Sequence, residues 1–474
     1  MAPVQSRRRP AYLCHLQICI ATAAPSILFN FSGAMALSTI AASAPSTAAL
    51  RRRVSTRVVA IPEDVWRQSA SEHTERIRSL LSPGLTSLDD PINSGSRRRL
   101  RREGHRNANA NAWTALDKNN PVFNFLIEYY GLKGAKGPRR LARWSPDPAL
   151  LLLRDEEVGK RGFERKGAAI ESVCDVGPAG GVLLEGATEE DLVGTLHLRG
   201  AIPTLDGSGI FYSPALFYNR YPFGDEKALT SDERMSKMKA AAPFQWYQSI
   251  ISNTLVSEPI FHCHGLHEWA MQYHPPGATP PPSGKYQAHL PLRVSREIIN
   301  STVERKGIHC THVDALRFFA PAAGPLNHHG AQLERTDQLR LEQKGCVHAS
   351  MDLLKMSLRL APFVDSSLVA DTLDMALSAR RLDIEASPYD VKSSYGLGVV
   401  PVETAEGREE YRRRQKELMH IAEPLRKRLN DAYDNFLVLA FEEEILSGAN
   451  RNPAPERFAK AEPGSKPWRK NLID

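Results

Sequence analysis

Histidines and carboxylates gather between residues 261 and 390, beside strongly apolar positions. Three segments each pair histidine with acid: FHCHGLHEWAMQYH (261–274), CTHVDALRFF (310–319) and GCVHASMDLLK (345–355). A fourth segment, RRLDIEASPYD (380–390), adds further acids. An imidazole beside a carboxylate titrates near neutral pH, so these segments favour proton-transfer chemistry. The candidate catalytic residues are His267, Glu268, His312, Asp314, His348 and Asp352.

We expect these six side chains to meet around one cavity, although 36 to 45 residues separate their segments. Apolar neighbours such as Leu266, Val313 and Leu353 should draw the polar groups inward. A buried ionisable group without a partner costs on the order of several kcal/mol, so the groups should pair or bind a ligand.

A bound metal is one alternative for the same residues. Imidazole and thiolate suit zinc, whereas imidazole with carboxylate suits zinc or iron. The chain repeats Cys-x-His at Cys310 and Cys346, but about 36 residues between the pairs is not a standard zinc spacing. Zinc and iron are therefore possible cofactors, without a defined ligand set. In another interpretation the histidines are buried groups satisfied by nearby carboxylates.

Five further residues are candidates for binding substrate. Arg317 and Lys355 have the charge to hold an anionic substrate. Trp269 and Tyr389 offer rings that stack on a planar ligand, and Asp390 closes the fourth segment. The alternative for Arg317 is an ion pair beside core aromatics, and the alternative for the rings is the hydrophobic core.

Helical periodicity predicts the elements that must position these groups, and the fold class is mainly α. One helix is expected from Pro62 to Leu81, and aromatic spacing indicates another within 121–132. Pro424 lies inside the longest pattern, 403–446, which predicts two helices or one kinked helix. The remaining predicted helices are 244–255, 294–303, 349–360 and 366–382.

Composition divides the chain into four ranges around one helical core. The main domain is expected at 113–447, with a Gly-rich stretch at 167–234 that reads as a hairpin or surface insertion. No glycine pattern there matches a phosphate-binding loop. A helix and a basic linker occupy 63–112, and a polar tail occupies 448–474.

Residues 1–62 have the composition of a disordered, cleavable targeting leader. They hold seven arginines and no acid, so the other residues carry 54 basic and 54 acidic side chains. His15 and Pro25 interrupt the apolar run, which argues against stable membrane insertion. The expected destination is a plastid, with the mitochondrion as the alternative.

Several motifs resemble a protein family found in bacteria and photosynthetic eukaryotes. The matching segments are PVFNFLIEYY (121–130), RLARWSP (140–146), GLHEWAMQY (265–273), CTHVDALRFF (310–319), GPLN (324–327), EQKGCVHASMDLLK (342–355), LDIEASPYD (382–390) and VETAEGREEY (402–411). This family carries the label 3-methyladenine DNA glycosylase. The resemblance implies a predominantly helical enzyme of DNA repair that hydrolyses an N-glycosidic bond.

For such an enzyme the damaged base would leave the duplex and stack on Trp269 or Tyr389. Asp352 or Asp314 would then support attack of water on an oxocarbenium-like sugar. The alternative is a helical His/carboxylate enzyme, with or without a bound metal, that acts on a small anionic metabolite held by Arg317 and Lys355. In a third class the cluster is a polar network that only specifies packing.

Overall fold

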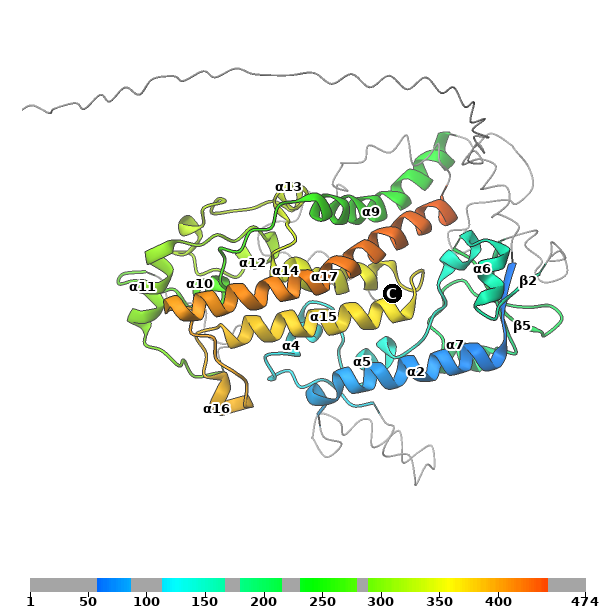
Figure 1. Ribbon diagram of the computed structural model, residues 1–474, viewed down its shortest axis with the longest axis horizontal. Coiled ribbons are helices and arrows are strands. Elements are labelled where there is room, and N and C mark those ends of the chain that lie inside the picture. The colour runs from blue at the N-terminus through cyan, green and yellow to red at the C-terminus, as the bar shows by residue number, and fades with distance from the viewer. Residues whose placement is uncertain (1–57, 87–112, 167–179, 215–230, 279–288, 442–474) are drawn as a thin grey trace, which may run out of the picture. The chain divides into compact units, whose positions relative to one another are not determined.

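The computed structural model describes residues 58–86, 113–166, 180–214, 231–278 and 289–441, which belong to one compact unit (Figure 1). Helices dominate these residues, which confirms the mainly α fold class. The first helices are α2 (Glu63–Leu81), α4 (Asn124–Glu128), α5 (Lys136–Leu141), α6 (Asp155–Lys160), α7 (Glu189–Gly194) and α9 (Ser231–Val256). The later ones are α10 (Leu266–Gln272), α11 (Arg296–Lys306), α12 (Val313–Leu316), α13 (Gln338–Leu341), α14 (Val347–Leu360), α15 (Ser366–Glu385), α16 (Val391–Tyr395) and α17 (Ala405–Ala440). Short 3-10 helices are η1 (Ser82–Gly84), η3 (Pro148–Leu152), η5 (Gly324–Leu326) and η6 (Arg335–Asp337).

Long helices packed along one another form the main layer. Helices α14 and α15 make the most extensive contact, and α17 packs against both of them and against α9 (Figure 1). Helix α2 covers another side of α15. The structure contains a helix at each of five predicted ranges, namely 62–81, 244–255, 294–303, 349–360 and 366–382. The boundaries agree within about three residues, except that 244–255 is the second half of the longer helix α9.

Helix α17 is continuous from Ala405 to Ala440 and contains Pro424. Of the two alternatives for the pattern at 403–446, two helices or one kinked helix, the described residues form a single helix. The Thr404 side chain begins the helix by accepting a hydrogen bond from the Gly407 backbone N–H at 3.0 Å. Pro424 lacks only its own N–H donor, and packing of the flanking turns on α9, α14 and α15 holds the helix together across it.

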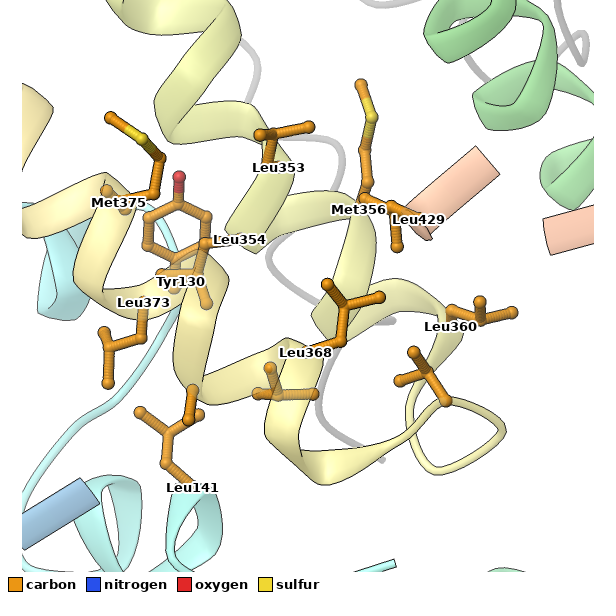
Figure 2. Close-up of a cluster of buried hydrophobic side chains, with 14 of the residues drawn as sticks. Tyr130, Leu141, Leu353, Leu354, Met356, Leu360, Leu368, Leu373, Met375 and Leu429 are labelled. Atoms are coloured by element: carbon orange, nitrogen blue, oxygen red, sulfur yellow. The ribbon is translucent and has the colours of Figure 1, made fainter. Parts of the chain in front are cut away.

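A large apolar core lies between α14, α15 and α17. Leu353, Leu354 and Leu360 of α14 face Leu368 and Leu373 of α15 within one cluster, and all five side chains are buried (Figure 2). The predicted aromatic helix at 121–132 is shorter than expected, because α4 ends at Glu128. Its aromatic residues still reach this core, where the Tyr130 hydroxyl donates to the Met351 carbonyl at 3.1 Å.

A small mixed sheet packs against this helical layer. Its strand order is β2-β1-β3-β5-β4, with β1 parallel to β3 and the other pairs antiparallel. The strands are β1 (Val58–Ile61), β2 (Glu164–Lys166), β3 (Gly181–Glu185), β4 (Ile202–Pro203) and β5 (Gly209–Tyr212). All four residues of β1 are buried, so the leader boundary expected at residue 62 is too late and the fold begins by Val58.

The Gly-rich stretch at 167–234 supplies three of the five strands. Strands β4 and β5 form the expected hairpin. Strands β3 and β5 are buried within the sheet, so these two strands belong to the core and are not a surface insertion. Its glycines allow close strand packing. A Cβ built at Gly209 would lie 2.0 Å from the Leu184 carbonyl oxygen of β3.

Several expectations fall outside the described residues. They concern the targeting leader up to residue 57, the basic run of 97–106 and the tail at 448–474. Among the helices that the structure describes, none combines the length and the apolar character that crossing a membrane requires.

Candidate functional site

Three separate segments bring their histidines into one row. His267 lies on α10, His312 directly precedes α12, and His348 lies in the first turn of α14. The ring centroids of His267 and His348 are 4.3 Å apart, and those of His312 and His348 are 5.2 Å apart. His348 therefore stands in the middle and is partly exposed, whereas the other two rings are buried.

Asp383 closes the row at the His267 end. The His267 Nε2 and Asp383 Oδ1 atoms are 2.6 Å apart, and Asp383 is fully buried on α15. Arg380, one turn earlier, donates from Nη1 to Asp383 Oδ2 and to Glu268 Oε1, both at 2.7 Å. Burial alone would raise the pKa of Asp383, but the charges of His267 and Arg380 outweigh it and hold that pKa well below its usual range.

Asp352 and Lys355 form the other end of the row. The His312 Nε2 atom is 3.3 Å from Asp352 Oδ2, and the Lys355 ammonium donates to the same oxygen. Gln338 Nε2 approaches this oxygen at 3.3 Å. Burial would lower the pKa of His312, but the Asp352 charge outweighs it and raises that pKa. Burial would raise the pKa of Asp352, but the charges of Lys355 and His312 outweigh it and hold that pKa well below its usual range.

Asp314 is the centre of a cluster of cations. Arg335 binds it through both oxygens at 2.8 and 3.1 Å, Arg317 donates at 2.6 Å, and Lys355 donates at 3.3 Å. Burial opposes ionisation, but these cations outweigh it and lower the pKa of Asp314 well below its usual range. Arg317 and Lys355, expected to hold substrate, are thus engaged in ion pairs within the chain.

The six candidate catalytic residues are therefore connected, as expected. Contacts run from Glu268 through Arg380 and Asp383 to the histidine row, and from there through Asp352 and Lys355 to Asp314. These six residues were also expected to surround one cavity. Neither of the two best-formed cavities in the described part of the chain is lined by any of the three histidines.

Two groups of side chains in this network have the donor atoms and spacing of a metal site. They are His267, His348 and Asp383, and His312, Asp314 and Asp352; within each group the donor atoms lie within 4.8 Å of one another. Lys355 already bonds to both carboxylates of the second group and would repel a divalent cation there. The first group has no cation between its donors, since Arg380 holds only the far oxygen of Asp383.

The thiols do not belong to either group of the described residues. Cys310 and Cys346 are buried, and burial raises the pKa of Cys310 to about 12. Neither thiol has two other donor atoms close enough to complete a metal-binding group among the described residues. In this part of the chain the repeated Cys-x-His pattern therefore places two buried cysteines beside the histidines without forming a Cys/His metal group.

The rings expected to stack on a ligand lie in the core. Trp269 is fully buried and donates from Nε1 to the Ala386 carbonyl at 2.8 Å. Tyr389 is also buried, and its hydroxyl accepts from Gln272 Nε2 at 3.2 Å. Asp390 caps α16 by accepting from the Ser393 N–H at 3.1 Å. Trp269 and Tyr389 therefore pack in the core among apolar neighbours, and Asp390 caps a helix. None of the three has the position that was expected for a substrate contact.

Asp383 belongs to the acid-rich segment 380–390 but was not predicted as a site residue. Arg380, Arg335 and Glu342 were not predicted as site residues either. Glu342 Oε2 is 3.7 Å from His312 Nε2 and is bonded to Gln338. The i, i+3 spacing of Arg380 and Asp383 was the available signal, because both face one side of α15.

Comparison with known proteins adds no assignment: no family model, curated protein or solved structure matches the chain.

Proposed function

We propose that this protein is an enzyme whose centre, formed by His267, His348 and Asp383, binds one divalent zinc or iron ion and acts on a small anionic substrate. Two histidines and one carboxylate are a ligand set found for both metals, and they leave coordination positions open. The donor atoms come from α10, α14 and α15, and the His267 and Asp383 side chains are buried.

One observation carries this proposal. His267 Nε2 and Asp383 Oδ1 are 2.6 Å apart and buried, and neither atom has a further hydrogen-bond partner among the described residues. A donor nitrogen of the nearby His348 ring lies within 4.8 Å of both of them. Three converging donor atoms of these types are the arrangement that a divalent cation requires.

The surrounding residues would orient such a centre and move protons. When bound, the metal would supply Lewis acidity and lower the pKa of a coordinated water. Arg380 fixes Asp383 through its other oxygen, which is the outer contact that orients a ligating carboxylate. Glu268 Oε1 is held by the same guanidinium, while Oε2 has no hydrogen-bond partner in the described structure and is available to accept a proton.

Metal analysis of the purified leader-free chain tests the proposal directly. We expect close to one equivalent of zinc or iron per chain, and its loss in His267→Gln and Asp383→Asn. Asp374→Asn is the matched control, because Asp374 lies on the same helix but is exposed. A folded wild-type chain that stays metal-free after incubation with Zn²⁺ and with anaerobic Fe²⁺ would overturn the assignment.

A DNA glycosylase of the 3-methyladenine type is the second candidate, and the ionised Asp352 carboxylate favours it together with the family resemblance. Its charge would stabilise a positively charged sugar after the base leaves. Release of methylated bases from an alkylated duplex by metal-free protein, abolished by Asp352→Asn, would support this candidate over the first. Binding to a duplex that contains an abasic-site analogue supplies a second readout.

A further inference from the structure

A cavity separate from the histidine row lies where α2, the segment leading into η3, the residues after α6 and the start of α15 meet. Its volume is about 360 Å³, which is within the range of sites that hold small organic ligands. Part of its lining is apolar and includes two aromatic rings. The apolar lining residues are Ile61, Val65, Trp144, Pro146, Leu150 and Phe163. Such a lining can take up the apolar body of a ligand.

His73 brings an unused hydrogen-bond acceptor to this cavity. The side chain is buried on α2 and lines the cavity, and its Nε2 lies 2.9 Å from the Leu141 carbonyl, which can only accept a hydrogen bond. Nε2 therefore carries the proton. Burial lowers the pKa of His73, so the ring is neutral near pH 7 and Nδ1 keeps its lone pair. Nδ1 is buried and has no partner among the described residues, so it favours a ligand that donates.

Two carboxylates line the same cavity, and each also caps a helix. Asp147 Oδ1 accepts from the Ala149 backbone N–H at 2.9 Å, and the described residues give this side chain no other hydrogen bond. Asp365 accepts from the Ser367 backbone N–H at 3.0 Å and from the Ser367 hydroxyl. A carboxylate accepts up to about four hydrogen bonds, so Asp147 in particular keeps acceptor capacity for a ligand.

The cations near this cavity leave Asp147 without a full counter-charge. Arg76 lines the cavity but is paired with Asp371 at 2.6 Å, and Arg161 is exposed. Burial raises the pKa of Asp147, and the charge of Asp365 acts in the same direction. The charges of Arg161 and other cations lower that pKa without reversing the effect of burial. A positively charged ligand would therefore find an electrostatic partner here.

We propose that this cavity binds a small organic amine as its protonated ammonium form, with an apolar body attached. The ammonium would donate to the Asp147 carboxylate and to His73 Nδ1, and the negative charge of Asp365 would add to the attraction. The apolar body would pack against Trp144 and Phe163. The site does not depend on the proposed metal centre, because it shares no ligand with that centre.

Titration calorimetry on the full chain tests the chemistry of the ligand with three probes of similar shape. Phenethylamine carries the ammonium, phenethyl alcohol is its neutral counterpart, and hydrocinnamate carries a carboxylate. We expect one saturable site for the amine and binding weaker by about tenfold or more for the alcohol, which corresponds to losing one charge-assisted contact. Hydrocinnamate should bind more weakly than the alcohol, because Asp147 and Asp365 repel it.

Two variants test the two acceptors. Asp147→Asn keeps a side-chain oxygen that can cap η3 but removes the charge, and it should weaken amine binding by about tenfold or more. His73→Gln can still donate to the Leu141 carbonyl but lacks an acceptor in place of Nδ1, so it should also weaken binding. Asp64→Asn is the matched control, because Asp64 is exposed on α2 and does not line the cavity. It should change affinity by less than about twofold.

Three results would overturn the assignment of an amine site. They are the absence of saturable phenethylamine binding, binding of the alcohol or of hydrocinnamate as tight as that of the amine, and equal weakening by Asp64→Asn and Asp147→Asn. If Asp147→Asn does not fold, His73→Gln and the three probes still decide the matter. The metal content of all three variants should equal that of the wild type, so this result is independent of the metal centre.

Discussion

The imidazole rings of His312 and His348 lie nearly parallel, with centroids 5.2 Å apart and an angle of 24° between their planes. This contact joins two different halves of one buried network. His312 belongs to the half that contains Asp352 and Lys355, and His348 belongs to the half that contains Asp383. Substitutions in the two halves should therefore have different consequences.

Asp352→Asn should destabilise the chain, because it leaves the Lys355 ammonium without its nearest counter-charge. Loss of one partner of a buried pair costs about 3 to 5 kcal/mol, and the remaining contact of Lys355 with Asp314 keeps the expected loss near the lower bound. Urea unfolding measures this loss. In the double variant with Lys355→Met, much of it should return. A destabilisation that Lys355→Met leaves unchanged would show that the pair is not its cause.

Removal of metal should lower the stability of the wild-type chain and leave that of Asp383→Asn unchanged. A ligand present at about 100 times its Kd stabilises the folded state by about 2.7 kcal/mol. A strong chelator should therefore lower the Tm of the wild-type protein and leave the Tm of Asp383→Asn unchanged. Asp374→Asn should respond as the wild type does. Equal responses of wild type and Asp383→Asn would count against a structural contribution from the metal.

His197 should make the fold sensitive to acid. Its pKa is about 3 in the folded chain, against an ordinary value of 6.5, because burial and neighbouring arginines disfavour the charged ring. As the pH falls below 6.5, His197 is protonated in the unfolded chain but stays neutral in the folded chain. The contribution of His197 to the free energy of unfolding is therefore present at pH 7 and is lost progressively toward pH 3. Chemical unfolding in buffers without phosphate should show a weaker loss between pH 7 and pH 5 for His197→Gln than for the wild type.

Trp269→Phe should affect stability and not ligand binding. The change removes the hydrogen bond to the Ala386 carbonyl and leaves a small void in a fully buried position. We expect a loss of about 2 kcal/mol in the free energy of unfolding. Duplex binding should stay within about twofold of wild type after correction for the folded fraction. A large loss of duplex affinity in a stably folded variant would restore the stacking role for this ring.

Periodicity was sufficient to predict the long helices, because their apolar faces repeat every three to four residues and bury against one another. It failed at Val58–Ile61, where four successive apolar residues continue a leader-like composition. A strand in the interior of a sheet is buried on both faces and has no alternation to recognise. The Gly-rich composition of 167–234 predicted a hairpin or a surface insertion, but the close strand packing at Gly181 and Gly209 depends on a partner strand that composition does not reveal.

The candidate site was predictable where a histidine and an acid lie close in sequence. His312 with Asp314, and His348 with Asp352, lie in segments whose apolar neighbours indicated burial. The pairing differs from the order in the sequence, because Asp352 contacts His312 and Asp314 contacts the surrounding cations. Asp383 reaches His267 only through the packing of α15 beside α10, which spacing along the chain does not encode. Trp269 and Tyr389 show the converse: residue type indicated a surface for stacking, and tertiary packing placed both rings in the interior.

Helix α14 carries His348 in its first turn and Lys355 seven residues later, about 10 Å along the axis. His348 lies in the histidine row near the start of α14, and Lys355 lines a small cavity between α2, α5 and α14. An α-helix is stiff along its axis, so the two residues move together. A shift of α14 along α15 would therefore change the surroundings of His348 and of Lys355 at the same time.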